Sequence, residues 1–195
     1  MSQNTFSPLP SMGAWQLIGA YTGFEVTRFS TTGDQITLHG TSLGVEAGTI
    51  WNLDYAIDLD SNWHVQRAVV NDRAGLRLVV ETDGAGRNWR VNGEPRPDLD
   101  GYLDFDLEAS AVTNTIPVHR LALAVGDKGQ SAAAYVRTNG LKVERLAQTY
   151  RRIQGKDGFI AFDYESPRFG YHDVLHFARD GLVVEYPEIG KRILV

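Results

Sequence analysis

Short stretches that alternate apolar and polar residues, separated by turn dipeptides, run through most of the sequence and limit the folds open to it. The stretch from Leu103 to Leu107 alternates with a period of two, as expected for a strand with one buried face. The turn dipeptides combine residues that tolerate positive φ: Asn92-Gly93, Asn139-Gly140 and Asp180-Gly181. Many short strands joined by such turns predict an all-β chain, folded as an antiparallel barrel or sandwich.

Helical periodicity is scarce. The stretch from Val143 to Tyr150 repeats its apolar residues at helical spacing, but it also alternates as a strand. Thr149 and Tyr150 favour the strand. We therefore predict a strand here and little helix in the chain as a whole.

The two halves of the sequence resemble each other. The same four short motifs occur in the same order, with spacings that differ by one or two residues: LDY at 53–55, WHV at 63–65, GL at 75–76 and VVE at 79–81, against FDY at 162–164, YHD at 171–173, GL at 181–182 and VVE at 183–185. We interpret this as a duplicated strand-hairpin-strand unit, an internal repeat over about 13–95 and 99–195. Since neither unit buries its apolar face alone, we predict a single domain over 1–195, with a mobile tail at 1–12.

Composition excludes several classes of function. The formal net charge is −5 and there is no basic run, which argues against nucleic acid as a partner. The absence of cysteine excludes disulfides, thiolate zinc sites and cysteine nucleophiles. We find no transmembrane stretch and no signal-peptide pattern, so we expect a cytoplasmic protein. The oligomeric state is not predictable from these features.

Motifs for cofactors, metals and nucleophiles are weak. Residues 40–44 match the G-x-S-x-G nucleophile elbow, but the motif runs into more strand instead of a helix, which favours a chance match. His172 and His176 share a strand face, but too few further ligands lie nearby for a metal site. Residues 84–86 lack the third glycine of a dinucleotide loop. We predict no cofactor and no metal.

Asp104 and Asp106 are the most notable pair of ionisable residues. They share one face of a predicted strand, where paired carboxylates can perform acid–base chemistry or form a solvated face. With His119 they give an alternative hypothesis, an enzyme acting on a sugar or lipid substrate. Arg120 can pair with either carboxylate.

The region from Trp89 to Leu121 carries the most distinctive motifs. They read W-x-V-x-G at 89–93, L-D-G-x-L-D-x-D-L at 99–107 and T-N-T-I-P-x-x-R-L at 113–121. This sequence resembles a bacterial glycolipid-binding family, and residues 150–152, 162–166 and 180–187 agree with the same family. The similarity covers most of the chain from about Gly33 onward.

The resemblance implies a duplicated, mostly antiparallel β-barrel that is incompletely closed, similar to lipoprotein carriers that hold acyl chains on a concave face. It supplies no catalytic residues. The leading hypothesis is a non-enzymatic protein that binds a glycolipid or other amphiphile. The remaining alternative is a solidly packed interaction protein.

The residues themselves are compatible with such a pocket. The chain holds 4 Trp, 8 Tyr and 8 Phe, which suit the packing of acyl chains and the stacking of sugar faces. The aromatic candidates for ligand binding are Trp51, Trp63, Trp89 and Tyr150. The polar candidates, which could hydrogen-bond sugar hydroxyls or a phosphate, are Asp104, Asp106, Asn114 and Arg120.

Overall fold

A computed structural model describes residues 6–108 and 110–194 of the protein. Within them one sheet of 15 strands follows the order β8-β7-β6-β5-β4-β3-β2-β1-β15-β14-β13-β12-β11-β10-β9. The strands are β1 Met12–Leu17, β2 Thr22–Thr32, β3 Gln35–Glu46, β4 Thr49–Leu59, β5 Val65–Asp72, β6 Arg77–Glu81, β7 Arg90–Val91, β8 Glu94–Pro95, β9 Asp104–Leu107, β10 Lys128–Val136, β11 Val143–Ile153, β12 Ile160–Ser166, β13 Tyr171–Phe177, β14 Val183–Tyr186 and β15 Gly190–Arg192. The helical elements are α1 Thr115–Leu121 and three 3₁₀ turns, η1 Pro97–Leu99, η2 Val112–Asn114 and η3 Pro167–Phe169.

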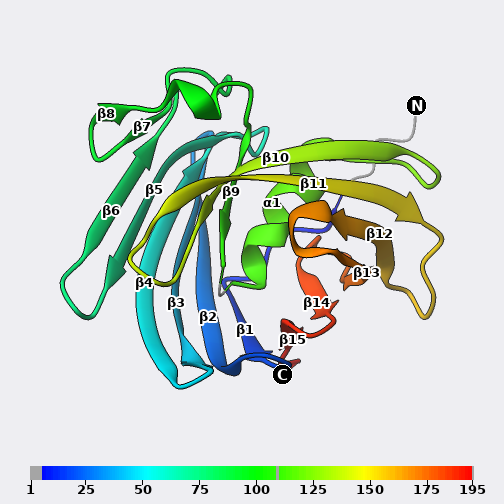
Figure 1. Ribbon diagram of the computed structural model, residues 1–195. Helices are drawn as coiled ribbons and strands as arrows, with labels where there is room; N and C mark the ends of the chain where they lie inside the picture. The colour runs from blue at the N-terminus through cyan, green and yellow to red at the C-terminus, as the bar shows by residue number, and fades with distance from the viewer. Residues whose placement is uncertain (1–5, 109, 195) are drawn as a thin grey trace.

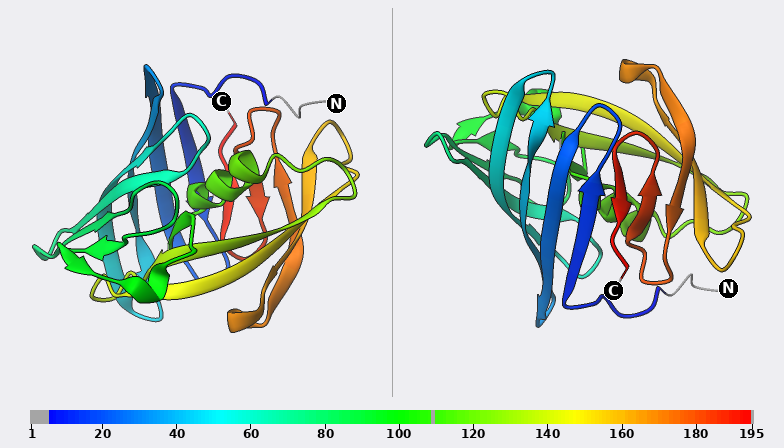
Figure 2. Two further views of the ribbon diagram at one scale, coloured as in Figure 1. Left: turned by 90° about the horizontal axis from the view of Figure 1, so that it is seen from above. Right: turned by 90° about the horizontal axis from the view of Figure 1, so that it is seen from below.

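The sheet curls into an incompletely closed barrel (Figure 1, Figure 2). Neighbouring strands are antiparallel, except that β9 pairs with β10 in parallel. Strand β9 comes close to β5 on the other side of the curl, but no hydrogen-bonded ladder joins the two within the described part of the chain. The structure thus confirms the predicted mainly β architecture with an open seam.

Helix α1 lies inside the curl, surrounded by strands in the views of Figure 2. Ile116 and Val118 on this helix are fully buried, in the same core as the inward side chains of the strands. The helix is short, and it contains Pro117 and three β-branched residues that lower helix propensity. Its stability therefore comes from burial, and it fills much of the space that an empty barrel would enclose.

The predicted turns and the ambiguous segment agree with the structure. Asn92 and Gly93, with φ of 52° and 85°, form the two-residue turn between β7 and β8. Asn139-Gly140 lies between β10 and β11, and Asp180-Gly181 between β13 and β14. The segment Val143–Ile153 is strand β11, as predicted.

Strand β3 contains the G-x-S-x-G motif, and its glycines serve packing. The motif lies in the middle of the strand, so the strand-to-helix turn of a nucleophile elbow is absent there. A Cβ at Gly40 would clash with the Tyr55 ring, and a Cβ at Gly44 would clash with the Trp51 ring. The two glycines let aromatic side chains of β4 lean across β3 toward the interior.

The two predicted halves correspond to similar pieces of sheet. The repeated motifs lie on β4–β5–β6 and on β12–β13–β14, and both triplets are antiparallel meanders. That the pieces arose by duplication stays a prediction. Of the predicted tail, residues 1–5 lie outside the described residues, whereas Phe6 packs on His119 and the Ser7 amide donates to the Arg179 carbonyl.

Candidate functional site

The barrel has two ends that differ in their filling. The β3–β4 turn and the β4–β5 turn lie at opposite ends of β4. We call the end with the β4–β5 turn and Trp63 the closed end, and the end with the β3–β4 turn and Glu46 the open end.

At the closed end, aromatic rings stack without a gap. The ring centroids of Trp63 and His119 are 3.8 Å apart, with an interplanar angle of 15°. The Phe6 ring packs against His119, with the centroids 4.2 Å apart. His119 Nε2 lies 3.1 Å from the carbonyl oxygen of Asp180. Burial lowers the pKa of His119 to about 4, so its ring is neutral at neutral pH.

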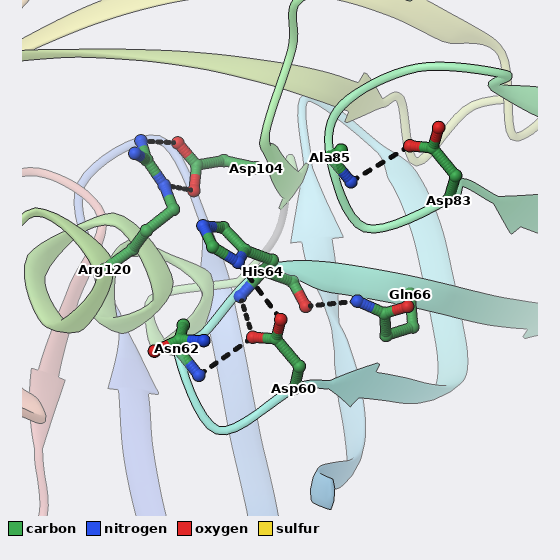
Figure 3. Close-up of polar contacts among 8 residues, drawn as sticks. All are labelled: Asp60, Asn62, His64, Gln66, Asp83, Ala85, Asp104 and Arg120. Atoms are coloured by element: carbon green, nitrogen blue, oxygen red, sulfur yellow. Dashed lines mark hydrogen bonds and ion pairs between the residues drawn. The ribbon is translucent and has the colours of Figure 1, made fainter. Parts of the chain in front are cut away.

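An ion pair inside the closed end joins α1 to β9. Arg120 donates two hydrogen bonds to Asp104, from Nε at 2.7 Å and from Nη2 at 2.6 Å (Figure 3). Ser131 Oγ donates to the same carboxylate at 2.7 Å. The Asp104 side chain is 1% exposed and the Arg120 side chain 10%, so both charges are satisfied inside the protein. The turn around Asp60 and His64 lies beside this pair in Figure 3.

The open end contains a pocket of about 320 Å³. Six aromatic rings line it, from β10, β12, β13, β14, η3 and the β1–β2 turn: Tyr21, Tyr135, Tyr164, Phe169, Tyr171 and Tyr186. Its polar lining consists of Glu46, Asp106, Glu108, Ser110, Asn114, Arg137 and Ser166. Such a mixture of apolar faces and a few placed polar groups is typical of ligand sites, and the volume is near the lower end of their usual range of roughly 300–1,000 Å³.

Three of these tyrosines form a mutually packed cluster. Tyr164, Tyr171 and Tyr186 have ring centroids 5.6 to 5.9 Å apart, with interplanar angles from 57° to 77°. The Tyr171 hydroxyl donates to the Pro187 carbonyl at 2.8 Å, and the Tyr164 hydroxyl accepts from Gln148. Tilted and edge-to-face packing of this kind fixes the three rings that line the pocket.

Asp106 lies on the pocket wall with neutral partners. Its carboxylate accepts from Thr113 Oγ1 at 2.7 Å and from Gln148 Nε2 at 3.0 Å. Burial raises its pKa from 3.8 to about 6, although these two hydrogen bonds and the Leu107 amide lower it. Asp106 is thus a buried carboxyl that titrates close to neutrality.

A buried carboxylate on β2 holds the neighbouring wall segment in place. Glu25 accepts from the Ser110 hydroxyl at 2.5 Å and from the amides of Ala111 and Val112 at 2.8 and 3.2 Å. The Tyr55 hydroxyl also donates to Glu25, at 2.7 Å. Four donors on one carboxylate fix the start of η2, from which Ser110 and Asn114 reach the pocket.

The structure divides the predicted site residues into three groups. Asp106 and Asn114 line the pocket. Tyr150 and Trp51 stand behind it: the Tyr150 hydroxyl donates to Asn114 Oδ1 at 2.6 Å, and the Trp51 ring packs edge-on against Tyr21 at 5.5 Å. The others do not line it, because Trp63, Asp104 and Arg120 lie at the closed end and the buried Trp89 donates to the Tyr102 carbonyl.

The three residues of the enzyme hypothesis are not brought together. Only Asp106 lines the pocket, Asp104 is neutralised by Arg120, and His119 is stacked under Trp63. The sequence reasoning missed the five tyrosines, Phe169, Glu46, Glu108 and Arg137. Tyr164 and Tyr171 stood within the repeated motifs of the second half, a usable signal, whereas nothing in the sequence connects Arg137 to this end of the barrel.

A family model described as "Putative glycolipid-binding" matches residues 12–192. The chain belongs to this family. The assignment agrees with the resemblance found in the sequence motifs, and the matched residues extend from the first strand to the last.

A solved structure has the same fold. The crystal structure of a DUF1089 family protein from Pseudomonas aeruginosa superimposes with a TM-score of 0.71 and 30% sequence identity. The alignment covers 87% of this chain and 92% of that chain. A comparison with curated proteins gives no match. Among the described residues, no helix has the length and hydrophobicity needed to cross a bilayer.

Proposed function

We propose that this protein is a non-enzymatic binding protein for a sugar-bearing amphiphile, and that the head group of the ligand occupies the tyrosine-lined pocket at the open end. The observation that carries the proposal is the pocket itself, in which aromatic faces and hydrogen-bonding groups converge in about 320 Å³. Aromatic rings can stack on the apolar faces of a sugar, while carboxylate, amide and hydroxyl groups can bind its hydroxyls. The family description, glycolipid-binding, supports the same class of ligand.

The pocket is large enough for only one part of an amphiphile, so we assign its head group and its hydrocarbon tail to different places. With α1 occupying the centre of the curl, about 320 Å³ suits a head group better than a complete lipid. An apolar groove of about 360 Å³ lies on the outer face of β2, β3 and β4, lined by exposed side chains that include Phe24, Leu43, Val45 and Ile50. Glu46 of the pocket directly follows Val45 of the groove, and Tyr21 of the pocket directly precedes Thr22. We therefore assign the groove to the hydrocarbon tail, which passes over this rim.

The presence of a pocket also favours binding over the other two hypotheses. A tyrosine-lined hollow does not fit a solidly packed interaction protein. The enzyme hypothesis requires Asp104, Asp106 and His119 to form one acid–base site, and they do not line a common pocket. The bacterial setting and cytoplasmic location expected from the sequence stay predictions.

Native mass spectrometry of freshly purified protein, followed by organic extraction, tests for a bound amphiphile. Titration with alkyl glycosides of increasing chain length, followed by tryptophan fluorescence, tests the two-part assignment. Each methylene buried contributes about 0.8 kcal/mol, so affinity rises steeply with chain length in the wild type. The double variant Val45→Ser, Ile50→Ser flattens this dependence and leaves the shortest glycoside unaffected. Absence of any co-purifying amphiphile together with no response to any glycoside contradicts the proposal.

A further inference from the structure

The charges that line the pocket do not balance. Three carboxylates line it, Glu46, Asp106 and Glu108, against one cationic side chain, Arg137. Arg137 Nη1 lies 2.9 Å from Glu108 Oε1, and its guanidinium lies 5.9 Å from the centre of the Tyr135 ring. The positive charge of Arg137 is therefore matched by Glu108. Asp106 and Glu46 have no ion-pair partner among the residues that the structure describes.

Of these two carboxylates, Asp106 is the more buried. It is buried, and its hydrogen-bond donors, Thr113, Gln148 and the Leu107 amide, are neutral. Two residues earlier on the same strand, Asp104 has a bidentate arginine. A buried carboxylate without a cation is unfavourable unless something else supplies the charge.

The same carboxylates contribute to the raised pKa values of two tyrosines that line the pocket. Burial, with added repulsion from Glu46 and Glu108, raises the pKa of Tyr21 to about 12. Burial, with added repulsion from Asp106 and Glu108, also raises the pKa of Tyr135 well above its usual range. These carboxylates therefore disfavour further negative charge at the rings that line the hollow.

The aromatic lining, like the carboxylates, favours a positively charged ligand. The faces of tyrosine and phenylalanine rings carry partial negative charge, so a cation over a ring face is attracted and an anion is repelled. The cluster of Tyr164, Tyr171 and Tyr186 holds three such rings at fixed angles around one space. Beside it the Ser166 hydroxyl is buried near the Tyr164 hydroxyl without a hydrogen bond of good geometry, which leaves an acceptor at the wall.

We propose that the head group bound in the pocket carries a protonated amine, as in an amino sugar, and that phosphate, sulfate or carboxylate head groups are excluded. This inference rests on the proposed function and narrows its ligand class. The ammonium lies between Asp106 and the tyrosine faces, and the sugar hydroxyls take the remaining acceptors and donors. Glu46 at the rim attracts the cation and repels anionic head groups.

Four octyl-chain probes test the inference at pH 7 by isothermal titration calorimetry. They are an octyl glucoside, the corresponding 2-amino glycoside, its N-acetyl derivative and an octyl glucuronide. We expect the amino glycoside to bind about tenfold more tightly than the two neutral probes, and the glucuronide to bind more weakly than any of them. N-acetylation is the matched control, because it keeps the nitrogen and removes its charge.

Substitutions of the two carboxylates test which of them causes the preference for the amino glycoside. Asp106→Asn and Glu46→Gln each reduce the advantage of the amino glycoside over its N-acetyl derivative, Asp106→Asn to less than about twofold. Asp34→Asn, an exposed carboxyl in the β2–β3 turn, is the matched control and leaves the advantage intact. Glu46 lies at the rim, so its substitution keeps the test valid if Asp106→Asn fails to fold.

The outcomes separate this inference from the proposed function. Equal affinity for the amino and N-acetyl probes overturns the charge assignment, while binding of the neutral glycosides still supports the proposed function. If none of the glycosides binds, both fail. If octyltrimethylammonium, which has no sugar, binds as tightly as the amino glycoside, the assignment to an amino sugar is overturned.

Discussion

The two ends of the barrel use the same kinds of residues for opposite purposes. At the closed end, Trp63 and His119 stack at 3.8 Å and Arg120 pairs with Asp104, so each ring and each charge has a partner. At the open end, tyrosine rings border a hollow, and Asp106 has no ion-pair partner within the described part of the chain. The difference shows that residue type alone does not mark a binding site. What marks it is an interaction that the protein itself leaves incomplete.

Strand β9 contains this contrast within three residues. Asp104 and Asp106 lie on one face of the strand, and a chain of hydrogen bonds through Ser131 and Gln148 connects them. The first carboxylate stabilises the attachment of α1, whereas the second carries a desolvation cost that a ligand can offset. Functional groups of this kind commonly reduce stability.

Removing Arg120 should have the largest effect on stability. Arg120→Ala leaves the Asp104 charge buried and unpaired, which costs about 3–5 kcal/mol. For a chain of this size we expect the melting temperature to fall by about 10 °C. Differential scanning calorimetry measures the change. Affinity for an alkyl glycoside, measured where the variant is fully folded, should stay within about twofold of the wild type, since Arg120 does not line the pocket.

Arg67→Ala is the matched control for this comparison. Arg67 pairs with Glu81 at 3.3 Å, but the two side chains are 41% and 46% exposed. An exposed pair contributes about 0–1 kcal/mol. An equal loss of stability in the two variants would show that the closed end does not depend on its buried ion pair.

Asp106 should make stability depend on pH in the opposite sense to a salt-bridged carboxylate. Its pKa in the folded protein is about 6 against 3.8 ordinarily, so the folded state binds a proton more tightly than the unfolded state. The stabilisation is present below pH 4 and is lost as the pH rises through 6. The loss amounts to about 3 kcal/mol.

Urea unfolding of the wild type and of Asp106→Asn between pH 4 and pH 7.5 isolates this contribution. We expect the wild type to lose most of this stabilisation relative to the variant across the interval, in addition to any pH-independent change that the substitution causes. A difference that does not change with pH would contradict the raised pKa. An added ligand with a protonated amine should stabilise the wild type more than the variant.

Glu25 connects the core to the pocket wall and should give an intermediate effect. Ala111 and Val112 donate to one oxygen of Glu25, and the Ser110 and Tyr55 hydroxyls donate to the other. Glu25→Gln replaces one of these oxygens by an NH₂ group, so one of the two pairs of donors loses its acceptor. We expect a loss of about 1–3 kcal/mol. Because the same segment carries Ser110 and Asn114 into the pocket, ligand affinity should fall as well. Hydrogen exchange of the amides of residues 110–114 measures the loosening, and unchanged exchange would refute the link.

Much of the fold could be predicted from the sequence because its determinants are local. The hairpin at Asp180-Gly181 and the strand at 104–107 depend on a few neighbouring residues, and both were predicted. The solvated face considered for this strand is wrong, because all four residues of β9 are buried between the sheet and the interior helix segment. Helix α1 escaped prediction because Pro117 and its β-branched neighbours give no helical signal, and only burial inside the curl stabilises it.

The site was less predictable, because distant strands build it. Asp106 and Asn114 lie within the distinctive motifs, so they could be selected from the sequence. Tyr21, Tyr135 and Tyr186 are scattered over more than 160 positions, and only the order of the strands brings them to one end. Three tryptophans were named as ligand-binding candidates because aromatic rings suit a lipid and sugar pocket, but large aromatic residues also fill cores, and Trp89 is 1% exposed.

Tyr171 offers the finest test of the difference between the two ends, because its hydroxyl and its ring have separate roles. The hydroxyl donates to the Pro187 carbonyl at 2.8 Å, and the ring forms part of the tyrosine cluster. Tyr171→Phe removes one hydrogen bond and should cost about 1 kcal/mol, with ligand affinity changed by less than about twofold. Tyr171→Leu removes the aromatic face too and should weaken binding of an amino glycoside about fivefold. Calorimetric titration of both variants distinguishes the roles: if phenylalanine and leucine weaken binding equally, the open end recognises its ligand through the hydroxyl, and the aromatic rings there are packing residues like those of the closed end.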